Sequence, residues 1–351
     1  MNLRSAAPAL AAALLFGAST PLAKLLLGDM PPQLLAGLLY LGSGAGLALL
    51  MVLRKLRAGA AVPDVRIPRA DLPWLLGAIA AGGVAGPVLL MFGLQRLDAA
   101  SAALLLNLEG VFTALLAWVV FRENADRSIV LGMAAIVAGG LLLAWTPGAG
   151  LAFSAGAGLV AAACLAWAID NNLTRKVATH DALLIAGLKG ALAGAVNTAA
   201  ALGAGASLPP TATVAAAMSV GFVGYGLSLA LFVVALRNLG TARTGAYFSV
   251  APLFGVLIAL AIWPQWPAPA FWLAAALMAL GVWLHVRERH VHAHTHEPMD
   301  HAHRHRHDAH HQHTHDFPWD GREPHTHPHH HAALTHTHAH VPDIHHRHGH
   351  G

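Results

Sequence analysis

Long apolar segments follow one another along residues 1–289, with only short polar loops between them. Runs of about 20 apolar residues suffice to cross a hydrocarbon core of roughly 30 Å. Ten such runs can be counted, at about 6–26, 33–53, 72–94, 98–121, 128–146, 154–176, 182–204, 211–236, 241–263 and 267–286. The pattern therefore predicts an all-α polytopic membrane protein with ten transmembrane helices. A composition of 56% hydrophobic and 11% charged residues excludes an ordinary soluble globule.

The ten segments form two blocks of five, and the blocks share a sequence pattern. Residues 97–142, moved forward by 142 positions, fall on residues 239–284 without a gap. Because five is odd, the two blocks enter the membrane in opposite orientations. Inverted repeats of this kind are typical of transporters, whose substrate site lies between the halves near the bilayer midplane. The expected domains are a first repeat at 1–147, a second repeat at 148–289 and a tail at 290–351.

Several stretches carry a family resemblance. The first block reads LLFGASTPLAK, SAALLLNLEGVFTALLAWVVFRE and LGMAAIVAGGLLL, and the second reads CLAWAIDNNLTRK, TGAYFSVAPLFGVLIALAIW and LAAALMALGVWL. Both resemble the repeat of the EamA branch of the drug/metabolite transporter superfamily, with Phe16-Gly17 corresponding to Trp167-Ala168. The resemblance implies a transporter that exports amino acids, metabolites, drugs or other small solutes. It does not identify the cargo, because one fold serves many functions.

Basic residues lie on one side of the predicted membrane. With a cytoplasmic N-terminus, the inner loops hold almost all Lys and Arg, whereas the outer loops 147–153, 205–210 and 264–266 hold none. The positive-inside rule then predicts that both termini are cytoplasmic. The family resemblance implies a multi-pass protein of the bacterial inner membrane. The basic pI follows from this topology and requires no nucleic-acid partner. The spans contain no HExxH, paired Asp or Ser/Lys arrangement, so we expect no enzymatic activity; the oligomeric state stays open, a homodimer included.

Three ionisable residues lie well within predicted spans: Glu109, Asp170 and Lys189. A charge at this depth is costly and is a candidate for function. At 1.5 Å of rise per residue, Asp170 and Lys189 both lie roughly 10 Å from the same end of two consecutive antiparallel helices. We therefore expect an ion pair, which serves either helix packing or the binding of a zwitterionic or charged solute.

Glu109 has no cationic partner at its predicted depth, and a low-dielectric surrounding favours the neutral form of a carboxyl group. It is therefore a candidate proton carrier for antiport, although a neutral Glu bonded to a neighbouring helix is the alternative. Further candidates for the substrate or proton pathway are polar residues next to these charges or next to Pro252, namely Asn107, Asn171, Tyr247 and Ser249.

The chemistry changes after Arg289, where residues 290–351 hold 24 of the 26 histidines. Low complexity and few large apolar residues predict a disordered cytoplasmic tail. Neutral imidazole suits Ni²⁺, Zn²⁺, Co²⁺ and Cu²⁺, so we expect this tail to bind divalent metal. The candidate ligands are His290, His292, His294, His296, His301, His303, His305, His307, His310, His311, His313 and His315.

Three functions follow from these patterns. The first is a secondary transporter, expected to be a proton-coupled exporter of an amino acid-like or other organic solute, with a metal-binding regulatory tail and no required cofactor. The second is an exporter of divalent transition metals, which the tail favours and Lys189 disfavours. The third is a membrane-anchored protein that sequesters or senses metal, for which ten helices would be an excessive anchor.

Overall fold

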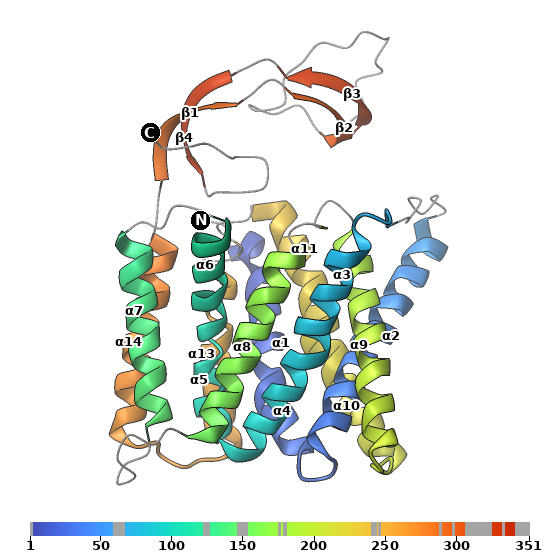
Figure 1. Cartoon of the computed structure of the whole chain (residues 1–351), viewed down its shortest axis with the longest axis vertical. Coiled ribbons are helices and arrows are strands. Elements are labelled where there is room, and N and C mark those ends of the chain that lie inside the picture. The colour runs from blue at the N-terminus through green and yellow to red at the C-terminus, as the bar shows by residue number, and fades with distance from the viewer. Residues whose placement is uncertain are drawn as a thin grey trace. The chain divides into compact units, whose positions relative to one another are not determined.

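A computed structural model describes residues 3–58, 67–121, 127–145, 154–174, 177, 181–239, 244, 247–287, 290–296, 299–305, 325–331 and 334–340. The chain divides into two units, Met1–Glu288 and Arg289–Gly351, and each is considered by itself. In the first unit every described element of secondary structure is a helix (Figure 1).

The first repeat contains α1 (Leu3–Leu26), α2 (Pro32–Ala58), α3 (Leu72–Ala78), η1 (Ile79–Ala85), α4 (Gly86–Arg96), α5 (Ala99–Leu105), α6 (Leu108–Phe121) and α7 (Arg127–Ala144). The second contains α8 (Ala155–Thr174), α9 (Ala182–Gly203), α10 (Thr211–Gly221), η3 (Phe222–Leu227), α11 (Ser228–Leu239), α13 (Ala251–Ile262) and α14 (Pro269–Arg287). The elements η1 and η3 are π-helical and continue the helices on either side of them.

Seven helices in the described residues are long and apolar enough to cross a membrane, which confirms a multi-pass class but not the count of ten. Residues 98–121, expected as one helix, are two: α5 and α6 are separated at Leu106–Asn107. Asp98 caps α5 through a 2.8 Å bond from the Ser101 amide to its carboxylate. The fourth segment is therefore broken near its middle, where sequence hydropathy alone shows no interruption.

Helices at equivalent places in the two repeats pack against each other. The α2–α9 contact brings backbones together at glycines, since a Cβ on Gly190 would lie 2.7 Å from the Gly44 amide nitrogen. The α7–α14 contact uses Gly139 and Gly281, which are 142 positions apart, and the two helices lie side by side in Figure 1. Small residues permit such close approach between helices in a bilayer.

The remaining contacts also come in matched pairs. The first helix of each repeat packs against the third and fourth segments of the other: α1 contacts α11 and α13, and α8 contacts α4 and α6. The paired contacts follow from a two-fold relation between inverted repeats, because each interface then occurs twice. They place α1 and α8 at the centre of the helical unit, between segments of the opposite repeat.

The described residues of the second unit form four strands, β1 (His290–His296), β2 (Met299–His305), β3 (His325–His331) and β4 (Leu334–His340). They form two antiparallel pairs, β1 with β4 and β2 with β3. The sequence predicts a disordered tail, and the four described strands differ from that prediction. Alternating histidines and small residues are compatible with extended pairing, yet a two-stranded ribbon alone is marginally stable in water. The absence of a packed core in the tail stays a prediction.

Candidate functional site

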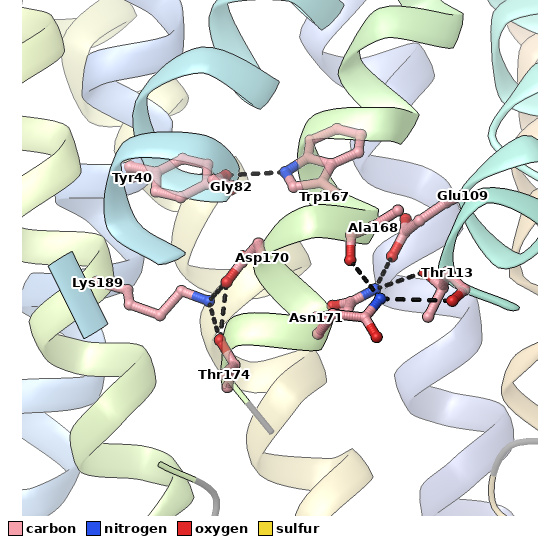
Figure 2. Close-up of polar contacts among 11 residues, drawn as sticks. Tyr40, Gly82, Glu109, Thr113, Trp167, Ala168, Asp170, Asn171, Thr174 and Lys189 are labelled. Carbon is pink, nitrogen blue, oxygen red and sulfur yellow. Dashed lines mark hydrogen bonds and ion pairs between the residues drawn. The ribbon is translucent and has the colours of Figure 1, made fainter. Parts of the chain in front are cut away.

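Polar side chains from three helices gather along one stretch of α8 (Figure 2). The contributing elements are α6, α8 and α9, and α2 with η1 lies one turn away. We call this group the α8 polar cluster and define it as Glu109, Thr113, Asp170, Asn171, Thr174 and Lys189. Its two halves lie on different faces of α8, because Asp170 and Asn171 are consecutive residues of one helix.

The first half is an ion pair between α8 and α9. The Lys189 Nζ lies 2.5 Å from the Asp170 Oδ1, and the two side chains are 17% and 9% exposed. The Thr174 hydroxyl, one turn further along α8, donates to the same carboxylate oxygen at 2.8 Å. Lys189 also donates to Thr174 at 3.2 Å. The contact expected from helix rise is thus confirmed, and it is compatible both with a packing role and with solute binding.

The second half joins α8 to α6. Asn171 Nδ2 donates to the Glu109 Oε1 at 2.9 Å and lies 3.3 Å from the Thr113 Oγ1. Glu109 is partly buried in the first turn of α6, and Thr113 lies one turn later. Glu109, Asp170 and Lys189 are also close enough to interact electrostatically. The cluster therefore combines two acids, one base and one carboxamide, and it can bind groups of either charge.

The π-helical segment η1 meets this cluster at Gly82. Its carbonyl oxygen accepts two bonds of 2.9 Å, one from the Tyr40 hydroxyl and one from the Trp167 indole nitrogen (Figure 2). The Asp170 side chain occupies the space that a Cβ on Gly82 would need. Asn197 of α9 donates to the next carbonyl, that of Gly83, at 3.2 Å. A π-segment leaves carbonyls without their usual helical partners, and these three donors come from both repeats.

Aromatic rings connect η3 to Tyr40 of α2, whose hydroxyl bonds to η1. Tyr225 of η3 lies 5.7 Å from Tyr40 and 6.0 Å from Phe16, measured between ring centroids. Phe16 in turn contacts Phe248 at 5.5 Å, and Phe248 contacts Phe232 at 4.9 Å. The Phe16–Tyr225 and Phe232–Phe248 pairs are edge-to-face, a geometry that stabilises packing beyond simple burial. The central part of the unit therefore has a charged face at α8 and an aromatic face at α1.

Three predicted pathway residues are not part of the contacts set out above. Asn107 donates to the Leu104 carbonyl at 2.8 Å, at the end of α5. Tyr247 and Ser249 immediately precede α13, and the polar contacts set out above for the described residues do not involve them. Sequence reasoning missed five participants, Tyr40, Thr113, Trp167, Thr174 and Asn197. Thr113 and Thr174 had a local signal, since they lie four residues after Glu109 and Asp170.

The tail candidates fall partly within the described strands. The register sets His292 opposite His338, His294 opposite His336 and His303 opposite His327. The predicted ligands His307, His310, His311, His313 and His315 lie outside the described residues. Within the residues described, no three His, Cys, Asp or Glu side chains come together in a way that could hold a metal ion.

Comparison with known proteins gives one family match. A model of the EamA-like transporter family matches residues 4–145 and again residues 154–287. The two matched ranges correspond to the two helical repeats. A solved structure titled "Crystal structure of protein" superposes with a TM-score of 0.58 at 20% identity, covering 80% of this chain and 95% of the other. At that identity the likeness concerns the fold alone.

Two relatives carry descriptive names. A protein of Methanothermobacter thermautotrophicus named "Uncharacterized transporter" is 30% identical over 269 residues, which cover 72% of this chain and 77% of the relative. A protein of Streptantibioticus cattleyicolor named "Probable terminal-alkyne amino-acid exporter" is 28% identical over 247 residues, which cover 69% and 83%. Both similarities extend over most of the helical unit.

Proposed function

Because the chain belongs to the EamA-like transporter family and is a multi-pass membrane protein, we propose that it is a proton-coupled exporter of a small, amino acid-like solute. The proposed setting is the bacterial inner membrane with both termini in the cytoplasm, as the basic loops predict. In the proposed transport cycle the two inverted repeats move against each other. A central site at α8 thereby becomes accessible first from one side of the membrane and then from the other.

The observation that carries the solute class is the α8 polar cluster. An amino acid presents an ammonium and a carboxylate a few ångströms apart, and Asp170 and Lys189 offer the opposite charges at 2.5 Å from each other. Placing both within a membrane protein is costly unless they remain paired or serve a substrate. A relative named as an amino-acid exporter supports the same class at 28% identity.

Glu109 is the proposed proton carrier. It lies across α8 from the ion pair, accepts a bond from Asn171 and interacts electrostatically with Asp170 and Lys189. Binding or loss of a proton at Glu109 would therefore change the charge balance at the place where a charged solute binds. Such coupling needs no separate ion site, because one carboxyl group alternates between two protonation states.

The tail is proposed to bind Ni²⁺, Zn²⁺, Co²⁺ or Cu²⁺ and to regulate transport. In both strand pairs the register sets histidines opposite histidines. Imidazole is a good ligand for each of these metals. The same tail favours a second function, export of the metal itself, and a third, sequestration or sensing of metal at the membrane.

Retention of amino acids and of metals in whole cells distinguishes the three functions. The cells would express the full chain, a truncation after Arg289, or Glu109→Gln. Exporter activity predicts lower retention of an amino acid with the full chain and the truncation, and no change with Glu109→Gln. Lower metal retention that Glu109→Gln abolishes would favour the metal exporter. Higher metal retention that only the truncation removes, with no effect on amino acids, would favour sequestration.

A further inference from the structure

The two π-helical segments occupy equivalent places in the two repeats. Moving η1 (Ile79–Ala85) forward by the repeat distance of 142 gives residues 221–227, and η3 is Phe222–Leu227. Their sequences, IAAGGVA and FVGYGL, share little beyond the glycine that aligns Gly82 with Gly224. π-Segments inside α-helices occur frequently at functional sites. Their recurrence at one repeat position indicates a property of the repeat and not of local sequence.

Each π-segment is contacted by the first helix of the opposite repeat at that aligned glycine. A Cβ on Gly224 would lie 2.6 Å from the Cβ of Ser19 in α1, and a Cβ on Gly82 would meet Asp170 in α8. The correspondence of Phe16 with Trp167 is a shift of 151 positions, which also places Ser19 on Asp170. Ser19 and Asp170 are therefore equivalent residues in equivalent contacts.

The comparison shows what the fold itself requires. The contact consists of a glycine on the π-segment and a side chain packed close to it. In the second π-segment that side chain is Ser19, which is uncharged. Its hydroxyl donates to the Phe16 carbonyl of its own helix at 2.6 Å. Counting from the starts of α2 and α9, Pro32 and Ala182, Lys189 corresponds to Leu39, an apolar residue that is 1% exposed. The ion pair is thus an addition to one repeat that packing does not demand.

The added charges lie against η1 at Gly82. Lys189 and Thr174 donate to the Asp170 carboxylate, which occupies the space next to Gly82. Tyr40 and Trp167 donate to the Gly82 carbonyl. Breaking the pair without a substitute would leave two unpaired charges away from water, which is strongly unfavourable. A solute with its own ammonium and carboxylate removes this penalty, since Asp170 can take the ammonium and Lys189 the carboxylate.

We propose that Asp170 and Lys189 form a substrate-operated latch on η1, which a zwitterionic solute opens by taking each of the two charges as its partner. The latch deepens the proposed function and rests on it. An amine or an N-acylated amino acid supplies one charge only, so one member of the pair stays unpaired and the latch remains closed. Discrimination thereby comes from an unpaired buried charge in the wrong complex, in addition to contacts in the right one.

Thiol labelling of the full chain in lipid nanodiscs tests the latch. The only native cysteine, Cys164, is fully buried and is replaced by Ala. The η1 reporter is Ala78→Cys, just before η1 where the side chain is buried, and the η3 reporter is Val220→Cys, its repeat counterpart just before η3. The latch is removed by Asp170→Ser with Lys189→Leu. This pair of substitutions copies Ser19 and Leu39 and so keeps the packing that the other repeat already uses. The matched control is Ser19→Ala.

The expected result is labelling of the η1 reporter by N-ethylmaleimide about tenfold faster in the latchless variant, because loss of a buried pair removes a large barrier to opening. Labelling of the η3 reporter should not rise, and Ser19→Ala should match the parent. In the parent, glycine and leucine should raise labelling of the η1 reporter, while ethanolamine and N-acetylglycine should not. Unchanged labelling of the η1 reporter, or equal acceleration at both reporters, would overturn the latch.

Labelling of the parent protein with and without amino acids separates this inference from the proposed function. If the latchless variant opens but no amino acid opens the parent, the pair is not substrate-operated and the inference is wrong. Amino acid flux into proteoliposomes containing the same parent protein decides the proposed function independently. Flux without any change in labelling of the η1 reporter would contradict the latch and leave the exporter in place.

Discussion

Tyr40 and Tyr225 connect the two π-helical segments across the centre of the helical unit. Tyr225 belongs to η3, and its ring centroid lies 5.7 Å from that of Tyr40. The Tyr40 hydroxyl donates at 2.9 Å to the Gly82 carbonyl in η1. A single side chain of α2 therefore contacts one π-segment through its ring and the other through its hydroxyl. Movement of either segment must change one of these contacts.

The first prediction concerns the two donors to the Gly82 carbonyl. Tyr40→Phe and Trp167→Phe each remove one 2.9 Å bond while keeping an aromatic ring. Each should lower the free energy of unfolding by about 1 kcal/mol. The double variant should lose more than the sum, because the carbonyl of the buried Gly82 is then left without either donor. Thermal unfolding in detergent measures these losses. If the loss in the double variant equals the sum of the two single losses, the two side chains do not donate to the same carbonyl oxygen.

The second prediction concerns space at Gly82. Gly82→Ala places a Cβ where the Asp170 side chain lies, so it should destabilise the protein by about 1–3 kcal/mol and impair transport. Gly158→Ala, on α8 itself but with nothing within 4 Å of the new Cβ, is the matched control and should not destabilise. Equal melting temperatures for the two variants would show that η1 and α8 are not in close contact.

The third prediction compares the loss of one member of the Asp170–Lys189 ion pair with the loss of both. Lys189→Leu alone leaves Asp170 without its partner and should cost about 3–5 kcal/mol of stability. Adding Asp170→Ser should recover most of that loss, because both positions then carry the residue types of the first repeat. Unfolding temperatures of the single and double variants are the measurement. A double variant less stable than Lys189→Leu alone would show that Asp170 contributes to stability without its partner.

Sequence patterns predicted much of the fold because hydropathy and internal repetition are strong signals in membrane helices. The Asp170–Lys189 contact was also predictable, since helix rise and a short connection determine which residues of neighbouring helices share a depth. The repeat relation of Gly139 to Gly281 likewise corresponds to a real contact between α7 and α14. These features depend on helix geometry and on the repeat itself, both of which the sequence displays.

The missed features depend on tertiary contacts between distant segments. Asn171 reaches Glu109 only because α6 packs on α8, and Tyr40 reaches Gly82 only because α2 lies against η1. The π-segments are invisible to hydropathy, since they change hydrogen bonding without changing composition. Asn107 was grouped with Glu109 because they lie within one turn, but the chain breaks between α5 and α6 and its amide is used there.

The fourth prediction concerns the tail. Truncation after Arg289 should abolish most Ni²⁺ and Zn²⁺ binding by the purified protein, because 24 of the 26 histidines lie beyond that point. The truncated protein should still transport its solute, since all residues of the α8 polar cluster are retained. Metal content by mass spectrometry and flux in proteoliposomes are the two readings. Undiminished metal binding after truncation would place a metal site in the helical unit.

Proton-coupled transport of an amino acid is the central claim, and Glu109→Gln tests it most directly. Purified protein in proteoliposomes would carry a pH gradient, an internal pH-sensitive dye and external amino acids, and the measurement is solute-dependent collapse of the gradient. The account predicts collapse with the parent and with Asp29→Asn, which removes an exposed carboxylate elsewhere, and none with Glu109→Gln. Collapse that is as fast with Glu109→Gln as with the parent would contradict a proton-carrying role for Glu109, and no collapse with any amino acid would contradict the solute class.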